Sequence, residues 1–222
     1  LGKFRVPAGI ESPNVNESYT YSRSYTLEAG IPQFGTGAMI RYQKHFLDIA
    51  VYAINGWNTI TDNNDAKTFG GRIGFNLLGD KLSFGVSYIS GPEVIPKRTY
   101  TNVRSPRHVV DFDLMYTGIN KLTLGFEANY SFEDRASQVN PDKRARWLSL
   151  LGMAHYKFLP WLGLTLRFEH ADDPDASRFA LVTPQVIGSP TTDQWFGIPL
   201  TIESVTASLL FTLAPGAYAI LE

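Results

Sequence analysis

Residues 122–132, LTLGFEANYSF, determine the fold class. Apolar side chains occupy every second position from Leu122 to Phe132, and the positions between them hold Thr, Gly, Glu, Asn and Ser. Successive side chains of a β-strand point to opposite faces, so this spacing gives one apolar face and one polar face. A helix would scatter the same apolar residues around its circumference. The stretch is therefore predicted to be a strand.

The same alternation recurs along most of the chain and predicts about eleven strands. They are joined alternately by tight turns and by long polar loops, and residues 10–34 form one of the long connections. The chain begins at Leu1 and closes on a strand-like stretch, so we expect residues 1–222 to be a single barrel domain that is incomplete at both ends. The predicted strands cover residues 1–9, 35–42, 47–53, 69–77, 82–90, 110–116, 122–132, 148–158, 162–169, 204–213 and 217–222.

The composition excludes several function classes. Charged residues are 18% of the chain and the net charge is −1, which gives no electrostatic basis for binding nucleic acid. The sequence contains no cysteine, so it has no disulfide and no thiolate metal site. No apolar run reaches the roughly 18 residues that a membrane-spanning helix needs.

Three features favour a membrane barrel over a soluble one. Short turns and long loops alternate, as they do between the two sides of outer-membrane barrels. Most predicted strands have about nine to eleven residues, which lets a tilted strand cross the hydrocarbon. Aromatic residues gather at strand ends, where interfacial girdles lie. The fold class is therefore predicted to be all-β, an antiparallel transmembrane β-barrel with short periplasmic turns and long outer loops. The predicted girdle residues are Tyr88, Tyr130, Phe132 and Trp57 near the long loops, and Phe46, Phe158 and Trp161 near the turns.

The polar face of the predicted strands is too charged for the dry interior of a small barrel. Buried unpaired charges are prohibitive, so this face must be wet or fully paired. About eight strands leave room only for side chains, so a wet interior requires a wider barrel. The residues predicted to line the pore are Arg41, Asp48, Arg72, Asn76, Asp111, Asp113, Glu127, Asn129, His155, Lys157, Arg167 and Glu169. The residues predicted to face lipid are Leu122, Leu124, Phe126, Leu164, Leu166, Phe84, Val86, Leu209 and Phe211.

A set of short motifs occurs in a fixed order along the chain. They are GKFRVPAGIE at residues 2–11, YSRSY at 21–25, NGW at 55–57 with DNN at 62–64, GPE at 91–93 and DDPDASR at 172–178. With these motifs the chain resembles the OmpL-like putative β-barrel porin family of Gram-negative outer membranes. The resemblance spans nearly the whole sequence and implies a diffusion channel in the bacterial outer membrane. It implies no catalytic motif and no cofactor.

Two functions from different classes stay open at this point. The first is a passive porin for small hydrophilic solutes or ions, with membrane lipid and lipopolysaccharide as its surroundings and a homo-oligomer as a possible assembly. The second is a sleeve or scaffold that encloses a partner such as a plug, a lipoprotein or a cytochrome. The charged inner face favours the porin. The Ser-, Thr- and Gly-rich inner faces of residues 82–90 and 204–212 leave room for the sleeve.

No enzyme site is predicted. Ser149 and His155 share a predicted face, but they are about 20 Å apart along the strand, which is too far for a catalytic dyad. Arg98, Arg104 and Arg107 are interpreted as a solvated loop rather than as a site for lipopolysaccharide or other anions.

No metal site is assigned either. Residues 62–65, DNND, and 172–175, DDPD, carry oxygen ligands that calcium prefers, but neither has the spacing of a full calcium-binding loop. Runs of Asn and Asp are also ordinary turn sequences. Asp172, Asp173 and Asp175 therefore remain weak candidates only.

Overall fold

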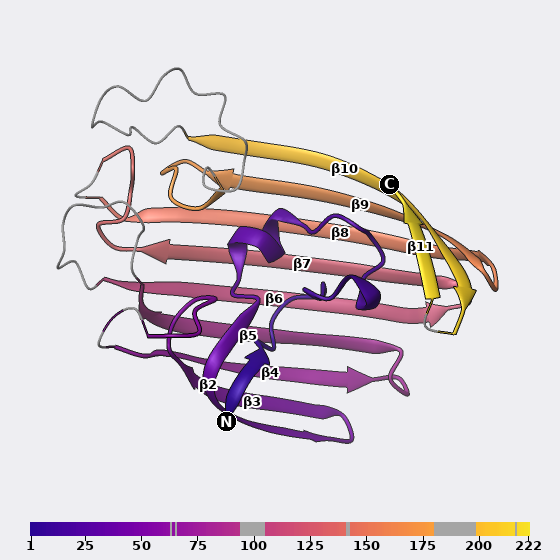
Figure 1. Ribbon diagram of the computed structural model, residues 1–222, viewed down its shortest axis with the longest axis horizontal. Helices are drawn as coiled ribbons and strands as arrows, with labels where there is room; N and C mark the ends of the chain where they lie inside the picture. Colours follow the sequence, from indigo (N-terminus) through magenta and orange to yellow (C-terminus); the bar gives the residue numbers. More distant parts are fainter. Residues whose placement is uncertain (63, 65, 94–104, 141–142, 180–198, 216) are drawn as a thin grey trace.

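Eleven antiparallel strands form one curved sheet, in which each strand pairs with its neighbours along the sequence (Figure 1). The structure is a computed structural model and describes residues 1–222 except 63, 65, 94–104, 141–142, 180–198 and 216. The all-β fold with about eleven antiparallel strands is confirmed. The strands are β1 (Gly2–Arg5), β2 (Phe34–Lys44), β3 (Leu47–Ile54), β4 (Thr68–Leu77), β5 (Leu82–Pro92), β6 (Pro106–Ile119), β7 (Leu122–Glu133), β8 (Ala145–Leu159), β9 (Leu162–Asp173), β10 (Leu200–Ala214) and β11 (Ala217–Leu221).

The connections divide the sheet into a short-turn end and a long-loop end. At the short-turn end, tight turns join β2 to β3, β4 to β5, β6 to β7, β8 to β9 and β10 to β11. Tight hairpins favour residues in the left-handed region, which His45 and Lys121 occupy with φ of 55° and 64°. The other connections are longer and follow the strands at the opposite end of the sheet. Among the described residues, no helix is long and apolar enough to cross a membrane.

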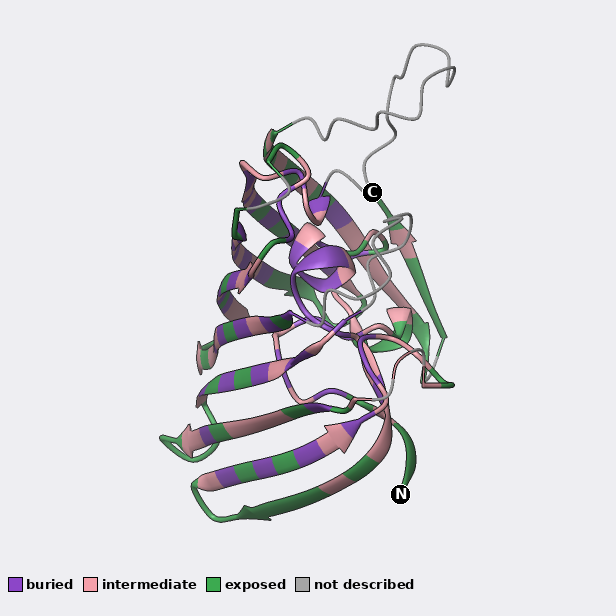
Figure 2. Ribbon diagram, turned by 90° about the vertical axis from the view of Figure 1, so that its left-hand side faces the viewer, coloured by how far each residue is buried: buried purple, intermediate pink, exposed green. Residues whose placement is uncertain are grey.

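The two faces of the sheet differ in exposure and in chemistry. Figure 2 shows buried and exposed residues alternating along the strands. On β7, Phe126 is 42% exposed on the convex face, whereas its neighbour Glu127 is 1% exposed on the concave face. The concave face is therefore covered by another part of the chain.

That cover is the connection between β1 and β2, residues 6–33, which we call the inner segment. It contains a 3₁₀-helical turn, η1 (Val15–Glu17), and a short π-helix, η2 (Thr26–Gly30). η2 packs against β7 and β8, and Figure 1 shows the segment crossing in front of the central strands. The sequence predicted a long polar connection here, and the structure places it inside the curve of the sheet.

An apolar cluster joins the inner segment to the wall near the long-loop end. Val6, Ala8, Leu27 and Ile31 of the segment pack with apolar side chains of β3, β5 and β6. Burying one aliphatic side chain of this size contributes about 1.5–3 kcal/mol. The cluster therefore fixes both ends of the inner segment against the sheet.

Trp57 belongs to this cluster, and its predicted place in an interfacial girdle is wrong. The side chain is 8% exposed. The guanidinium groups of Arg107 and Arg178 lie 4.8 and 4.6 Å from its ring, and its backbone N–H donates to the Glu93 carboxylate. These partners come from distant parts of the chain, so spacing within the sequence around Trp57 gave no sign of them.

Candidate functional site

The candidate site is the concave face of the sheet together with the inner segment. The strand register places every predicted pore-lining residue on the concave face and every predicted lipid-facing residue on the convex face. Most of the predicted pore-lining residues are buried, and Lys157, close to the short-turn end, is exposed. The predicted pore-lining residues share one face of the sheet, but they differ in the groups that they bind.

A chain of ion pairs runs across the concave face from β2 to β6. Arg41 binds Asp48 through two hydrogen bonds of 2.8 and 2.6 Å. Arg72 lies 3.6 Å from the same carboxylate and binds Asp113 with both terminal nitrogens. Bidentate arginine–carboxylate pairs are strong and geometrically specific. These four residues neutralise one another within the wall.

Asp111 and Glu127 hold the start of the inner segment. Asp111 Oδ1 accepts from the Gly9 N–H at 3.1 Å, and Glu127 Oε2 accepts from the Ile10 N–H at 2.8 Å. Their other oxygens, Asp111 Oδ2 and Glu127 Oε1, have no hydrogen-bond partner among the described residues. Asp111 of β6 and Glu127 of β7 therefore join the inner segment to the sheet.

Gly9 is required where these carboxylates meet the segment. Its φ is +73°, which favours glycine, and a Cβ atom there would lie 2.7 Å from Glu127 Oε1 and from Ile31 Cδ1. The backbone can approach the carboxylates this closely only without a side chain. The sequence PAG at residues 7–9 is the local sign of this approach.

Arg167 holds the middle of the inner segment. It is 2% exposed, and its Nη1 donates to Glu11 Oε1 at 2.9 Å, to Thr20 Oγ1 at 2.8 Å and to the Ser22 carbonyl at 2.7 Å. Its Nε also lies 2.9 Å from Glu169 Oε1. A buried guanidinium needs such a set of acceptors. Arg167 therefore joins the inner segment to β9.

Two further contacts anchor the inner segment, through Tyr25 and Tyr19. Glu169 Oε2 accepts from the Tyr25 N–H at 2.6 Å. Thr165 donates its hydroxyl proton to the Tyr19 carbonyl at 3.0 Å and lies 2.9 Å from His155 Nδ1. Because the Thr165 proton is already used, His155 Nδ1 is the donor of that second bond. The Tyr19 and His155 rings also lie against each other, with centroids 4.5 Å apart.

The structure corrects the interpretation of Arg107 as part of a solvated loop. Arg107 is 6% exposed, lies in β6 and pairs with Glu133 at 2.9 Å. Its guanidinium lies over the rings of Trp57 and Trp147. The other two arginines of that set, Arg98 and Arg104, lie outside the described residues.

The weak calcium candidates already have protein partners. Asp173 belongs to β9, which extends beyond its predicted end at residue 169. The Asp173 carboxylate accepts backbone N–H groups of Ser177, Arg178 and Phe179 at 2.7–2.8 Å. Asp172 accepts from Thr201, and Asp175 from the Arg146 N–H. Within the described ranges no group of three or more His, Cys, Asp or Glu residues has the arrangement of a metal site. Asn63 and Asp65 of the other candidate lie outside those ranges.

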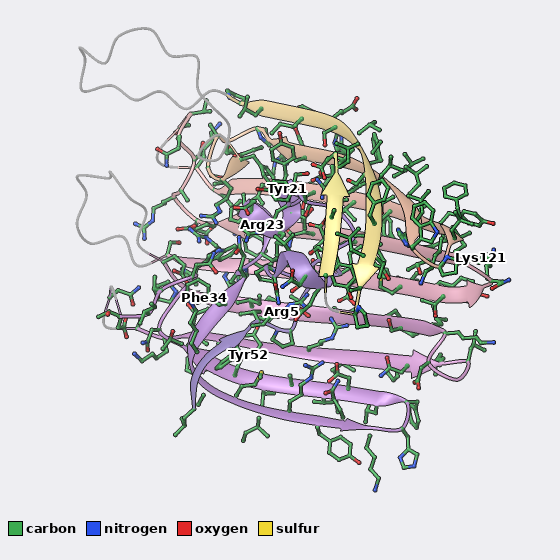
Figure 3. All side chains as sticks on the ribbon, turned by 45° about the vertical axis from the view of Figure 1, so that its right-hand side comes forward. Arg5, Tyr21, Arg23, Phe34, Tyr52 and Lys121 are labelled. Atoms are coloured by element: carbon green, nitrogen blue, oxygen red, sulfur yellow. The ribbon has the colours of Figure 1, made fainter. Side chains whose placement is uncertain are left out.

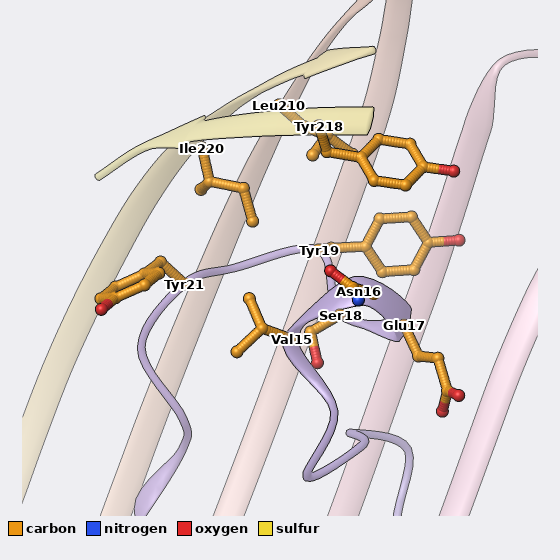
Figure 4. A pocket seen from close by; sticks show the side chains of 9 residues that line it. All are labelled: Val15, Asn16, Glu17, Ser18, Tyr19, Tyr21, Leu210, Tyr218 and Ile220. Carbon is orange, nitrogen blue, oxygen red and sulfur yellow. The ribbon is translucent and has the colours of Figure 1, made fainter. Parts of the chain in front are cut away.

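Two cavities open between the inner segment and the last strands. One has a volume of about 500 Å³ and is lined by the segment around η1 together with β10 and β11 (Figure 4). The other has a volume of about 420 Å³ and lies at the short-turn end. They share Tyr19, Leu210 and Tyr218. The inner segment was predicted only as a connection, so neither cavity was expected from the sequence.

Comparisons with known proteins agree with this geometry. The sequence profile of the family described as "Putative beta-barrel porin-2, OmpL-like" matches residues 1–216. A comparison with curated proteins finds no match. Among solved structures, the fold is similar to that of the outer membrane channel DcaP of Acinetobacter baumannii, with a TM-score of 0.64 and 11% sequence identity. The similarity covers 96% of this chain but 60% of that channel, so this chain spans less than two thirds of its length.

Proposed function

Because the chain belongs to the OmpL-like putative β-barrel porin family, we propose that it forms a passive, water-filled channel for small hydrophilic solutes or ions. The protein is located in the bacterial outer membrane. Its convex face meets lipid there, and we expect the concave face to surround the path of the solute. The family indicates a channel rather than an enzyme.

The observation that carries the proposal is the concentration of charge on the concave face. Arg72, Asp113 and Arg167 all point inward, whereas the convex positions beside them are apolar. Charges on the wall of an aqueous pore set the field that a passing ion experiences. These charges can act on a passing ion only where water or a charged solute reaches the concave face.

We further propose that the inner segment narrows this channel. It crosses the concave face and is held by side chains of β6, β7 and β9. A segment held at several points keeps a fixed position. The inner segment therefore reduces the cross-section of the channel permanently and does not act as a gate. The predicted pore-lining residues then act in two ways, as anchors for the segment and as charges beside the path.

The test is single-channel conductance of the full-length protein in a planar bilayer. Arg5 and Phe34 pair in register, so a tight turn can replace residues 6–33 without moving β1 or β2. We expect stable ohmic steps from the wild type and larger steps from the turn variant. Steps of equal size would show that the inner segment does not narrow the path.

A substitution that leaves the segment in place provides an independent test. Asp113→Asn removes one negative charge beside Arg72, so the reversal potential in a salt gradient should shift toward anion selectivity. Glu203→Gln is the matched control, because the Glu203 side chain is 70% exposed and points to the convex face. An equal shift in both variants would contradict a pore path along the concave face.

The alternative function is a sleeve for a partner protein. It is favoured by the short polar side chains on the inner side of β10, among them Ser204, Thr206 and Ser208. A sleeve predicts a wild-type protein that is silent in the bilayer and conducts only after the partner is removed. Ohmic steps from the purified protein alone would exclude it.

A further inference from the structure

The short-turn end of the sheet carries unbalanced positive charge. Lys44, Lys81, Lys121 and Lys157 lie in or near its turns. Asp48, the carboxylate next to the first turn, is already bound by two arginines. In the turn between β4 and β5, Asp80 is exposed, and it offsets only part of the charge of these lysines. Lys121 marks this end of the sheet in Figure 3.

Two of these lysines line the cavity of about 420 Å³ that lies there. Lys121 comes from the turn between β6 and β7, and Lys157 from β8. No carboxylate lines this cavity in the described part of the chain. Its other polar lining includes the hydroxyl groups of Thr123 and Thr212.

The ammonium groups of Lys121 and Lys157 are available to a ligand. Within the described residues neither has a carboxylate partner, and the Lys121 Nζ reaches only the Phe158 carbonyl, at 3.5 Å. An ammonium group has three donors, so most of the hydrogen-bonding capacity of both lysines is unused. Two unpaired cations on one cavity wall attract an anionic group.

Tyrosine rings form a second, apolar part of the same lining. Tyr19 and Tyr218 border both cavities, and Figure 4 shows their side chains one above the other and pointing the same way. Tyr218 is 47% exposed, so its ring is accessible. Tyr19 is held by the Thr165 bond to its carbonyl and by the His155 ring against its own.

We propose that this cavity binds a small sugar acid. The anionic group lies between Lys121 and Lys157, the C–H face of the sugar ring lies on the tyrosines, and the sugar hydroxyls bond to Thr123 and Thr212. Tyrosine suits this role because it offers a flat apolar ring with a polar end. The proposal rests on the proposed channel function, since it names the class of solute that the channel would take.

The first experiment measures how added solutes interrupt the single-channel current of the full-length protein. Glucuronate is the probe, with glucose and acetate as the neutral sugar and the simple anion. We expect glucuronate to interrupt the current at a concentration about tenfold lower than either of the others, because only it uses both parts of the site. Equal effects of acetate and glucuronate would overturn the role of the tyrosines.

Substitutions separate the two parts of the site. Lys121→Gln with Lys157→Gln should weaken the glucuronate effect about tenfold, which is the loss of roughly one charged contact. Tyr218→Leu should weaken the effect of glucuronate but not that of acetate. Lys81→Gln is the control, because this lysine lies at the same end but does not line the cavity. An unchanged glucuronate effect in the double lysine variant would overturn the site.

Calorimetry in detergent distinguishes failure of the site from failure of the proposed function. If the protein does not conduct, the channel proposal is wrong, but glucuronate binding to the folded protein can still be titrated. Binding that is lost in the double lysine variant and kept in Lys81→Gln supports the site. No binding of glucuronate to the folded wild type overturns it.

Discussion

Neighbouring residues of β7 serve two regions with different requirements. Phe126 is on the convex face, where it lies against another ring, that of Phe112, with centroids 6.3 Å apart. Glu127 is on the concave face, where one of its oxygens accepts a backbone N–H from the inner segment. The convex face needs apolar side chains of almost any shape, whereas the concave face needs particular donors and acceptors. Tolerance to substitution should therefore alternate along a strand.

The largest effect is expected on the concave face, from Arg167→Met. This change leaves Glu11 and Glu169 buried without their guanidinium partner, and breaking a buried ion pair typically costs about 3–5 kcal/mol. The measurement is the free energy of unfolding in urea after refolding into lipid vesicles. A loss below about 1 kcal/mol would mean that the network is solvated.

On the convex face, Phe126→Arg should have the next largest effect. A charged side chain near the midplane of a membrane barrel costs about 2–4 kcal/mol. Phe126→Leu is the matched control and should unfold almost as the wild type does, because that position requires only an apolar side chain. Equal stability of Phe126→Arg and Phe126→Leu in vesicles would place this residue away from lipid.

Alanine substitutions at two glycines test the difference between the faces without any change of charge. Gly9→Ala should cost about 1–3 kcal/mol, because its φ of +73° is strained for alanine and the added methyl would meet Glu127 and Ile31. Gly152→Ala is the control, since a Cβ there has nothing within 4 Å. The same unfolding assay applies. Similar losses in both variants would show that the close approach at Gly9 does not matter.

The smallest effect is expected from Arg144→Gln, outside both regions. Arg144 and Asp134 form an exposed pair with side chains 58% and 48% exposed. The hydrogen bond from Arg144 lowers the pKa of Asp134, so this pair contributes above the unfolded pKa of the carboxyl and its contribution is lost as the pH falls. The variant should raise the pKa of Asp134 toward its ordinary value, as measured by NMR titration, with little change in unfolding. An unchanged pKa would show that the pair does not form in solution.

The sequence predicts the strands and their faces because both depend on neighbouring positions. Alternation in residues 122–132 determines the orientation of Phe126 and Glu127, and the pairing of tight turns with long loops predicts antiparallel order. The partners of Glu127 and Arg167 do not follow from such spacing. Their bonds go to backbone groups and side chains of a segment more than 100 residues away, and no period connects the two. The predictions of Trp57 in an interfacial girdle and of Arg107 in a solvated loop were wrong for the same reason, because the spacing around each residue does not reveal that the two side chains are in contact.

The distance in sequence between the inner segment and its anchors also orders the folding of the chain. Gly9 is 102 residues from Asp111, and Glu11 is 156 residues from Arg167. Contacts of such high contact order form slowly, because a long loop must close before they contribute. The bonds that hold the inner segment come from β6, β7 and β9, so the segment must wait until these strands have assembled. We therefore expect docking of the inner segment to be a late kinetic phase that follows formation of the sheet.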